Sequence, residues 1–460
     1  MEYAYEHDSS LAPRHGPHGR LSMDQTCFVH CIAVEFHLQL DGWARPAMAV
    51  RVVWFQIGVD VAMTDVSRIV SRLAASFRLA AARAGVGFYP VHDLDMHLSA
   101  TIDWLRCAQD ATPDGGVAQS YFVKRGVWTN SYPETTGYII PTMLRYAEVA
   151  GDEDARERAK RMADWECEIQ LPDGGVVAGA VGDSDRPTVF NTGQVLFGFV
   201  VAAEAFGAAR YERSAREAAD WLCAAQDDDG CWRRFGSPMT ADAVNVYNTR
   251  TAWALARAHQ LTGEQRYLDA AVSNCDWAMT RRQENGWFAG NCLLDPAQPF
   301  VHTIAYAMRG LLEVGVCAQR QEFIDAAASI GDAMVEALPE SGFLPGRFDS
   351  EWRGTVRWSC LTGNAQLAVN LGRLYQLRGD SRYREAVFTL NRFNCRTQAL
   401  SGDPPVRGGV KGSHPIDGGY HPWQYPNWAA KFFADALMME ADLRKEQRSG
   451  TAGPHPAFTG

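Results

Sequence analysis

The chain of 460 residues carries a formal net charge of −10, and 47% of its residues are hydrophobic against 21% charged. This composition is typical of a globular protein with a large core. No block of Lys and Arg is dense enough to bind a phosphate backbone, which argues against nucleic acid as a partner. No apolar run reaches the roughly 18–20 residues that cross a bilayer, so no membrane span is expected.

The eleven Cys residues indicate a reducing compartment rather than a disulfide framework. Four of them recur at one place in helical patterns, as small buried hydrophobes do: Cys107, Cys167, Cys223 and Cys275. The N-terminus makes a poor signal peptide, because Arg51 and Asp60 interrupt its apolar stretch. We therefore expect a cytoplasmic protein.

The chain divides into three parts by pattern. Residues 1–62 lack clear periodicity and mix His, Pro and Gly, which predicts an irregular N-terminal arm outside the main fold. Residues 63–443 hold the periodic helical segments. Residues 444–460 are polar and end in a Gly- and Pro-containing stretch, which predicts a disordered tail.

A repeat of 56 to 61 residues runs through the periodic part. An Asp-Trp pair recurs in four segments: Asp103-Trp104, Asp164-Trp165, Asp220-Trp221 and Asp276-Trp277. Two degenerate copies fall in register at Ala333 and Phe393. Each copy predicts a helix that ends near a Gly-containing turn such as QLPDGG or QENGW. A period of this length is typical of repeated supersecondary units.

A second, more apolar helix follows each of these turns. The six segments are 135–151, 191–207, 248–263, 302–315, 361–379 and 427–443. Five of them close on a Gly expected as the C-cap: Gly151, Gly207, Gly263, Gly315 and Gly379. Near their starts a Thr recurs as the expected N-cap: Thr136, Thr192, Thr249, Thr303 and Thr362.

Six helical hairpins without an alternating strand pattern predict an all-α fold, an (α/α)6 toroid that closes into a ring. The apolar helices are expected to form the inner ring, because they are hydrophobic on most sides. The amphipathic Asp-Trp helices are expected to form the outer ring.

The turns at 226–232 (QDDDGCW) and 283–287 (QENGW) resemble the Gln/Trp repeat of squalene and terpenoid cyclases. The hairpin rhythm over residues 90–442 looks more like the six-hairpin glycosidase-like superfamily, with the related toroids of polysaccharide lyases and uronyl 5-epimerases. Neither an Asp-x-Asp-Asp nor an Asp-Asp-x-x-Asp motif stands at an inner-helix start, which disfavours the terpenoid alternative. The resemblance implies a carbohydrate-active toroid, and many chemistries share this scaffold.

The starts of the six apolar helices are the expected site, because the N-terminal ends of inner helices meet at one end of such a ring. Their unpaired N–H groups favour anions, including a sugar carboxylate. Polar and aromatic side chains that a plain cap does not need crowd there: Glu134, Tyr138, Gln194, Tyr247, Arg250, His302, Tyr306, Trp358 and Tyr425.

A lyase or epimerase that acts on a uronic-acid-containing polysaccharide is the first functional hypothesis. Such an enzyme neutralises the sugar carboxylate and moves the neighbouring proton with a Tyr or His. Tyr247 or His302 would serve as base or acid, and Tyr138 suits the same role. Asn191, Asn248 and Arg250 would hold the carboxylate in that scheme.

A glycoside hydrolase is the second hypothesis, and it needs two carboxylates that flank the scissile bond. Glu134 is the candidate acid, with Asp349, Glu351 or Asp242 as its partner. A third hypothesis is a non-catalytic glycan-binding toroid in exopolysaccharide assembly. All three take an oligo- or polysaccharide as the partner.

The C-terminal stretch GGYHPWQYPNW (418–428) is dense in aromatic residues, and His421, Trp423 and Tyr425 are expected to form a sugar-stacking platform. No CxxC pair has metal-ligand spacing, and no Gly-rich loop follows a strand pattern. Neither a metal nor an organic cofactor is therefore expected.

Overall fold

A computed structural model describes residues 31–38, 48–55, 88–237, 240 and 244–449. The chain divides into two units, residues 1–78 and residues 79–460. In the first unit, strand β1 (Cys31–Leu38) pairs antiparallel with strand β2 (Met48–Phe55), so that Cys31 lies opposite Phe55. This pair falls in the segment for which the sequence shows no clear periodicity.

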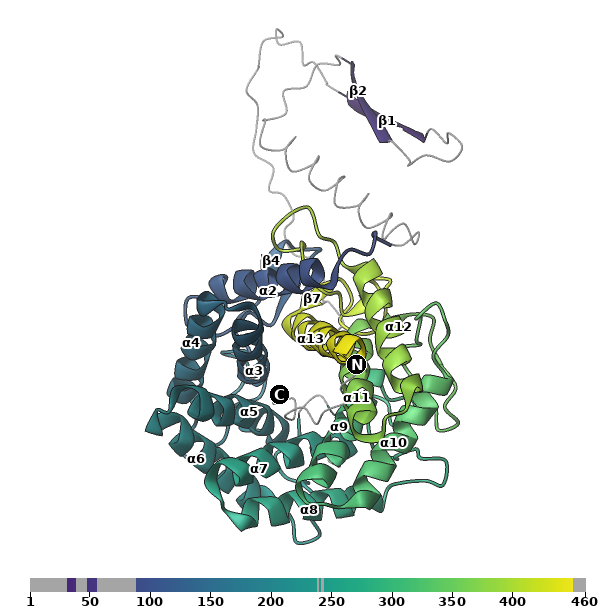
Figure 1. The fold of residues 1–460 in the computed structure, drawn as a ribbon. Helices are drawn as coiled ribbons and strands as arrows, with labels where there is room; N and C mark the ends of the chain where they lie inside the picture. Colours follow the sequence, from purple (N-terminus) through teal and green to yellow (C-terminus); the bar gives the residue numbers. More distant parts are fainter. Residues whose placement is uncertain (1–30, 39–47, 56–87, 238–239, 241–243, 450–460) are drawn as a thin grey trace, which may run out of the picture. The chain divides into compact units, whose positions relative to one another are not determined.

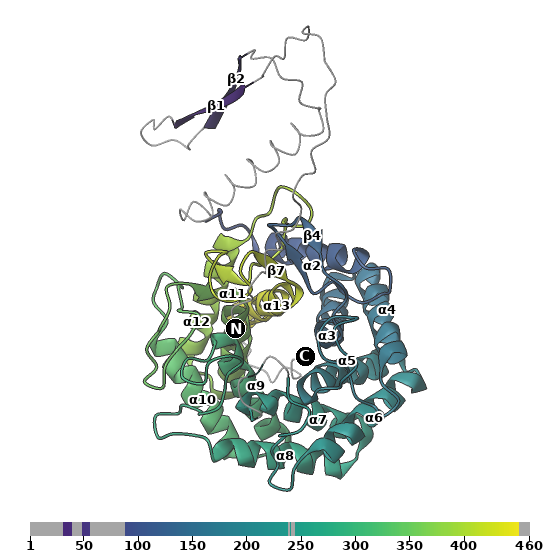
Figure 2. The same cartoon turned by 180° about the vertical axis from the view of Figure 1, so that it is seen from behind.

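Six helices of the second unit form an inner ring, in which each packs on the next and the last packs on the first (Figures 1 and 2). They are α3 (Pro133–Ala150), α5 (Val189–Phe206), α7 (Thr249–Thr262), α9 (Val301–Cys317), α11 (Leu361–Arg378) and α13 (Asn427–Ser449). A short 3-10 helix, η1 (Val246–Asn248), leads into α7. All six predicted apolar helices are present, and their sides are buried almost all round.

The outer ring consists of the Asp-Trp helices and their degenerate copies. They are α2 (Leu94–Asp110), α4 (Glu153–Ile169), α6 (Ala209–Ala225), α8 (Gln265–Met279), α10 (Gln321–Glu336) and α12 (Ser381–Thr397). Each inner helix from α3 to α11 packs against the outer helix that follows it. The last inner helix, α13, packs against α2, so the first and last helices complete the sixth hairpin. The fold is therefore the predicted all-α (α/α)6 toroid.

Helix ends differ in detail from the predictions. Gly151, Gly207, Gly263 and Gly379 are C-caps with φ between 66° and 75°, as expected from their freedom to adopt the left-handed conformation. The prediction that Gly315 is a C-cap is wrong, because α9 continues through this residue to Cys317. A Cβ at Gly315 would meet the backbone of Arg320 and Ile324, so this Gly permits close packing instead. Helix α13 continues through residues 444–449, beyond the predicted end at 443.

In α3 and α5, the Thr near the helix start bonds to the preceding loop and is not the predicted N-cap. The cap residues of α3, α5 and α9 make no side-chain cap bond. Instead Thr136 Oγ1 accepts from Val117 N at 3.0 Å, and Thr192 Oγ1 accepts from Val176 N at 3.0 Å. Thr136 and Thr192 lie inside the first turn, where their hydroxyls hold the loop from the outer helix against the inner one. Thr303 Oγ1 donates to the Asn291 carbonyl of the preceding loop at 3.1 Å, whereas Thr249 Oγ1 donates to the Ala307 carbonyl of α9 at 3.2 Å.

A repeated polar contact joins neighbouring outer helices. A Tyr near the start of one helix donates to the Asp of the Asp-Trp position in the preceding helix, and the Arg before that Tyr contacts the same Asp. The pairs are Tyr211 with Asp164, Tyr267 with Asp220 (2.5 Å) and Tyr383 with Asp332 (3.0 Å). This contact sets the register of each outer helix on the next.

The Gly-containing turns make a second repeated contact. Gln226 Nε2, at the end of α6, donates to the Gly230 carbonyl at 3.0 Å and to the Ala270 carbonyl of α8 at 2.9 Å. Gln170 makes the same pair of bonds to Gly174 and Ser214. Gly230 has a φ of 85°, and a Cβ there would lie 2.2 Å from the Ser273 carbonyl oxygen. The Gln and the Gly of each turn therefore lock it onto the next outer helix.

Short strands cover the end of the ring where the inner helices begin. Strand β3 (Ser120–Phe122) pairs with β4 (Val127–Trp128) and with β7 (Gln424–Pro426), and β5 (Ser359–Cys360) pairs with β6 (Ser413–His414). They tie the loop before α13 to the loops before α3 and α11. Among the described residues, α5 alone is long and apolar enough to cross a membrane by composition, and 78% of its span is buried in the ring.

Candidate active site

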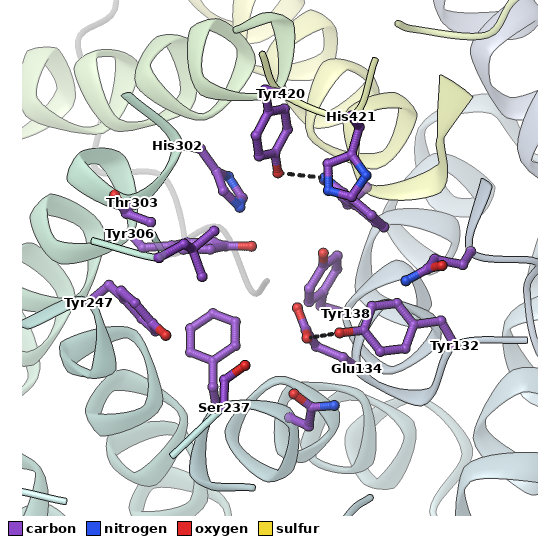
Figure 3. A pocket seen from close by; sticks show the side chains of 15 residues that line it. Tyr132, Glu134, Tyr138, Ser237, Tyr247, His302, Thr303, Tyr306, Tyr420 and His421 are labelled. Carbon is purple, nitrogen blue, oxygen red and sulfur yellow. Dashed lines mark hydrogen bonds between the residues drawn. The ribbon is translucent and has the colours of Figure 1, made fainter. Parts of the chain in front are cut away.

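A pocket with about 590 Å³ of free space opens at the N-terminal ends of the inner helices (Figure 3). Its walls come from the starts of α3, α5, α9 and α13 and from the loops between them. The lining residues are Gln119, Tyr132, Glu134, Tyr138, Phe190, Asn191, Ser237, Tyr247, Leu293, His302, Thr303, Tyr306, Tyr420, His421 and Trp428.

Glu134 enters the pocket from the first turn of α3. Tyr132 is extended and Pro133 occupies the first helical position, where its fixed φ suits a helix start. Tyr132 Oη donates to Glu134 Oε2 at 2.5 Å. Burial raises the pKa of Glu134 to about 7, while the Tyr132 bond and the charge of Arg250 oppose the rise. At neutral pH this carboxyl group can therefore give or take a proton.

Two imidazoles face the same pocket. His302 is the second residue of α9, and its ring lies 4.4 Å from that of Tyr306 and 5.2 Å from that of Tyr420, centroid to centroid. His421 precedes α13 and packs edge-on against Trp428. Burial lowers the pKa of His302 to about 3 and the pKa of His421 to about 4. Both rings are neutral at pH 7 and can each accept a hydrogen bond or a proton.

Tyrosine hydroxyls occupy much of the remaining wall. Burial raises the pKa values of Tyr138, Tyr247 and Tyr306, so these phenols stay protonated at neutral pH. Phe190 packs against both Tyr247 and Tyr306, with centroids 5.0 and 5.1 Å apart, and fixes their orientation. Neutral phenols donate hydrogen bonds but are weak bases, so Tyr138, Tyr247 and Tyr306 are hydrogen-bond donors at neutral pH.

The titratable groups stand on different sides of the open centre. Figure 3 shows Glu134 with Tyr132 and Tyr138 on one side and His302 with Tyr306 on the other. Tyr420 lies between the two His residues along the rim, where its Oη accepts from Trp428 Nε1 at 2.9 Å. A sugar bound in this centre would have an acid–base group near each of two faces.

The structure brings seven of the thirteen predicted site residues together at this pocket. They are Glu134, Tyr138, Asn191, Tyr247, His302, Tyr306 and His421. Asn191 is held by a bond from its Nδ2 to the Val177 carbonyl at 2.9 Å.

Three predicted residues lie near the starts of α5 and α7 but outside the pocket lining. Arg250 is 2% exposed, and its Nε donates to Gln194 Oε1 at 2.7 Å. Five aromatic rings surround its guanidinium, which places it inside the ring of helices rather than against a bound sugar. Asn248 belongs to η1 and is 7% exposed.

Three further predicted residues pack against protein instead of lining the pocket. Trp358 packs beside Phe300, with ring centroids 6.1 Å apart. Lys124 Nζ lies over the Trp423 ring, 4.5 Å from the ring centroid. Tyr425 is buried in β7 opposite Tyr121. Of the expected stacking platform, only His421 reaches the pocket.

Two of the carboxylates considered as partners of Glu134, Asp349 and Glu351, are not in the pocket lining. Asp349 accepts from the backbone N–H groups of Glu351 and Arg353 in a surface turn, and it pairs with the Arg353 side chain. Glu351 is exposed in the same turn. Asp242 lies outside the described residues. Within the described lining, Glu134 is therefore the only carboxyl group.

Several residues that line the pocket were not among the predicted site residues. Tyr420 and Trp428 stand within the aromatic stretch 418–428, which pointed to them, and Tyr132 stands three residues before the predicted helix 135–151. Gln119, Ser237 and Leu293 come from loops that no repeat pattern places. The described residues contain no group of three or more potential metal ligands.

No protein-family description matches the sequence, and no curated protein matches it. Solved structures do match. An unsaturated glucuronyl hydrolase specific for heparin aligns with a TM-score of 0.62 and 18% identity, over 76% of this chain and 98% of that chain.

Two other neighbours catalyse different reactions. Cellobiose 2-epimerase from Bacillus thermoamylovorans aligns with a TM-score of 0.60 and 9% identity, over 74% of this chain and 98% of that one. A D-mannose isomerase aligns with a TM-score of 0.59 and 14% identity, over 77% of this chain and 100% of that chain. These neighbours are carbohydrate-processing enzymes with closed helical rings. The chain therefore has the (α/α)6 toroid fold of these structures.

Proposed function

We propose that the pocket catalyses proton transfer on a sugar unit of a uronic-acid-containing glycan, leading to β-elimination or epimerisation. The observation that carries the proposal is the set of titratable groups: one carboxyl group poised near neutrality and two neutral imidazoles around one pocket. Proton transfer to and from carbon is most efficient with a group whose pKa lies near the working pH, which Glu134 has, and the neutral imidazoles are the other proton acceptors at the pocket.

The roles follow from the geometry. His302 or His421 takes the proton from the carbon next to the sugar carboxylate. Glu134, protonated through its raised pKa, delivers a proton to the leaving oxygen in elimination or to the opposite face in epimerisation. The hydroxyls of Tyr138 and Tyr306 donate hydrogen bonds to the negative charge that develops on the carboxylate.

A hydrolase with a carboxylate pair has less support. Acid and nucleophile or base carboxylates stand about 5 to 9.5 Å apart in such enzymes. The described lining supplies Glu134 alone, and Asp349 and Glu351 are engaged or exposed in a separate turn.

Hydrolysis of an unsaturated uronyl sugar is a second candidate, favoured by that same lone carboxyl group. The enol ether of such a sugar needs one proton donor, after which water adds to the activated carbon. Glu134 can supply that proton. The unsaturated glucuronyl hydrolases among the structural neighbours are consistent with this candidate.

The test is to incubate the full chain in D2O with uronate polysaccharides and with oligosaccharides that end in an unsaturated uronyl residue. Ultraviolet absorbance of the C=C bond, reducing ends and deuterium in the sugar are followed together. Rising absorbance indicates elimination, and deuterium without an absorbance change indicates epimerisation. Falling absorbance on the unsaturated substrates supports the second candidate. Reducing ends from saturated substrates without deuterium in the sugar contradict both.

A further inference from the structure

Gln366 of α11 lies directly behind the part of the pocket wall that His302 forms. It is 3% exposed, and contacts on either side of it fix this face of α11 against α9. One turn earlier, a Cβ at Gly363 would lie 2.8 Å from His302 N. One turn later, Asn370 Nδ2 donates to the Ala305 carbonyl at 2.8 Å. Residues three and four positions apart share one face of a helix, so the Gln366 amide is held toward α9.

The amide of Gln366 forms hydrogen bonds with two residues of the pocket lining, His302 and Tyr306. These two stand four residues apart on α9, and their ring centroids are 4.4 Å apart (Figure 3). A primary amide has one end that accepts and one end that donates, so it can bond to an imidazole N–H and to a phenol oxygen at once. Gln366 can therefore fix both rings together.

The two bonds indicate which end of the amide faces which ring. Burial lowers the pKa of His302, and the Gln366 bond opposes this shift, as expected when the amide oxygen accepts from a ring N–H. Burial raises the pKa of Tyr306, and the Gln366 bond opposes that shift too, as expected when the amide nitrogen donates to the phenol oxygen. A neutral imidazole has one N–H, so the second ring nitrogen of His302 carries a lone pair.

The uncharged amide of Gln366 orients the imidazole without adding negative charge beside it. The titratable groups around His302 come from several elements: Arg250 of α7, Tyr306 of α9, Cys360 of β5, and Tyr420 and His421 of the loop before α13. Burial and the positive charge of Arg250 both disfavour the imidazolium. The ring therefore stays neutral at pH 7 and keeps its lone pair available.

We propose that Gln366 is a positioning residue of the proton-transfer site. It fixes the tautomer of His302 so that the lone pair faces the pocket, and it fixes the Tyr306 hydroxyl beside that lone pair. In a uronate the acidic carbon and the carboxylate are bonded to each other, so a base and a hydrogen-bond donor held side by side match them. This inference rests on the proposed function and extends it by assigning proton abstraction to His302 rather than to His421.

The ring-nitrogen chemical shifts of His302 test the positioning without any substrate. They are measured by NMR at pH 7 on the full chain with 15N-labelled histidine, and the His302 signals are assigned by their loss in His302→Gln. We expect one tautomer in the wild type. We expect a mixture of both tautomers in Gln366→Met, which keeps about the same volume but removes both hydrogen bonds. A single unchanged tautomer in Gln366→Met overturns the proposal.

Gln376→Met is the matched control, because Gln376 lies ten residues further along α11, about 15 Å at 1.5 Å per residue. It should keep the wild-type tautomer of His302. A mixture of tautomers in this control as well would show that the effect is not specific to Gln366, and it would overturn the proposal.

The pH dependence of turnover tests the role of Gln366 in catalysis. Gln366→Glu replaces the amide by a carboxylate, which stays ionised because Arg250 and Arg309 line the same narrow space. A neighbouring negative charge favours the imidazolium, so the acid limb of the pH–rate profile should move up by about 1–3 pH units. Gln376→Glu adds the same charge farther along α11 and should leave the profile unchanged. An unmoved acid limb in Gln366→Glu overturns the proposal.

Failure of this inference and failure of the proposed function give different results. If no uronate glycan is converted, the proposed function fails, and the tautomer measurement still decides whether Gln366 positions His302. Gln424 is the amide that hydrogen-bonds to His421. If the wild type is active and the acid limb moves in Gln424→Glu but not in Gln366→Glu, the function stands and the assignment to His302 is overturned.

Discussion

Glu134 combines two properties that a proton-transfer residue needs, a place in the pocket wall and a pKa of about 7. Glu134→Gln keeps the shape and the contact with Tyr132 but removes the titratable proton. We expect the turnover rate to fall by about 10²–10⁴-fold. The limb of the pH–rate profile near pH 7 should disappear with it.

Glu351→Gln is the matched control, because this Glu lies in an exposed turn outside the pocket lining. Its turnover rate should equal that of the wild type. A loss in Glu351→Gln as large as that in Glu134→Gln would revive the hydrolase hypothesis with a carboxylate pair.

The two imidazoles make the folded state sensitive to acid. An unfolded His binds a proton near pH 6.5, whereas burial holds the folded pKa values of His302 and His421 at about 3 and 4. Between these pH values the unfolded chain binds more protons, so the free energy of unfolding falls as the pH falls from about 6.5 toward 4. Glu134 contributes in the opposite direction, because its folded pKa is raised.

The double variant His302→Gln/His421→Gln removes both of these proton-binding sites. Urea unfolding at pH 7 and pH 4.5 should therefore show a smaller loss of stability on acidification than in the wild type. An equal loss in both proteins would mean that other groups govern the acid sensitivity.

Asn191 and His302 stand in the first turn of an inner helix, where the sequence places them at the mouth of the ring, and they line the pocket. Tyr138 and Tyr306 stand one turn deeper in α3 and α9 and line the pocket as well. Gln194 is three residues further along α5 than Asn191, about 4.5 Å deeper at 1.5 Å per residue, and it bonds to Arg250 inside the ring. Polar residues that stabilise the interior and polar residues that face a substrate therefore look alike in the sequence.

At the scale of the helices, the Gly of each outer turn decides how closely the next helix can approach. Gly230→Ala would add a Cβ 2.2 Å from the Ser273 carbonyl oxygen in addition to left-handed strain. Gly263 has a similar φ of 75°, but a Cβ added there would have no atom within 4 Å. The variant Gly263→Ala therefore measures the backbone strain of the left-handed conformation without a steric clash. We expect a loss of about 1–2 kcal/mol for Gly263→Ala and a clearly larger loss for Gly230→Ala, measured by urea unfolding. Equal losses would show that the close approach does not matter.

The repeat predicted the helices because it combines three independent signals: the Asp-Trp spacing, the Gly-containing turns and the apolar second helices. It did not predict the strands β3 and β7, which are three residues each and pair across some 300 residues of sequence. It also misplaced the end of α9, because a Gly can permit close packing inside a helix as well as end one.

At the scale of the whole molecule, ring closure depends on the packing of α2 on α13, from opposite ends of the second unit. Both helices belong to residues 79–460, and this unit contains all twelve described helices of the two rings. A chain that begins at residue 79 should therefore fold and show the same cooperative unfolding of its helices as the full chain, followed by circular dichroism. Loss of helical signal in that chain would show that residues 1–78 are required for the ring.

Incorporation of solvent deuterium into the sugar tests the central claim most directly, because it reports transfer of the carbon-bound proton itself. In D2O, epimerisation by the wild-type protein should place deuterium at the carbon next to the uronate carboxylate, and hydrolysis should place it at the protonated carbon of an unsaturated uronyl substrate. β-Elimination leaves no hydrogen at the carbon next to the carboxylate, and the new C=C absorbance reports it instead. Glu134→Gln should place about 10²-fold less, and Glu351→Gln as much as the wild type. Conversion of a uronate glycan with neither deuterium on carbon nor a new C=C absorbance, or with an undiminished signal in Glu134→Gln, would contradict the assignment of this pocket.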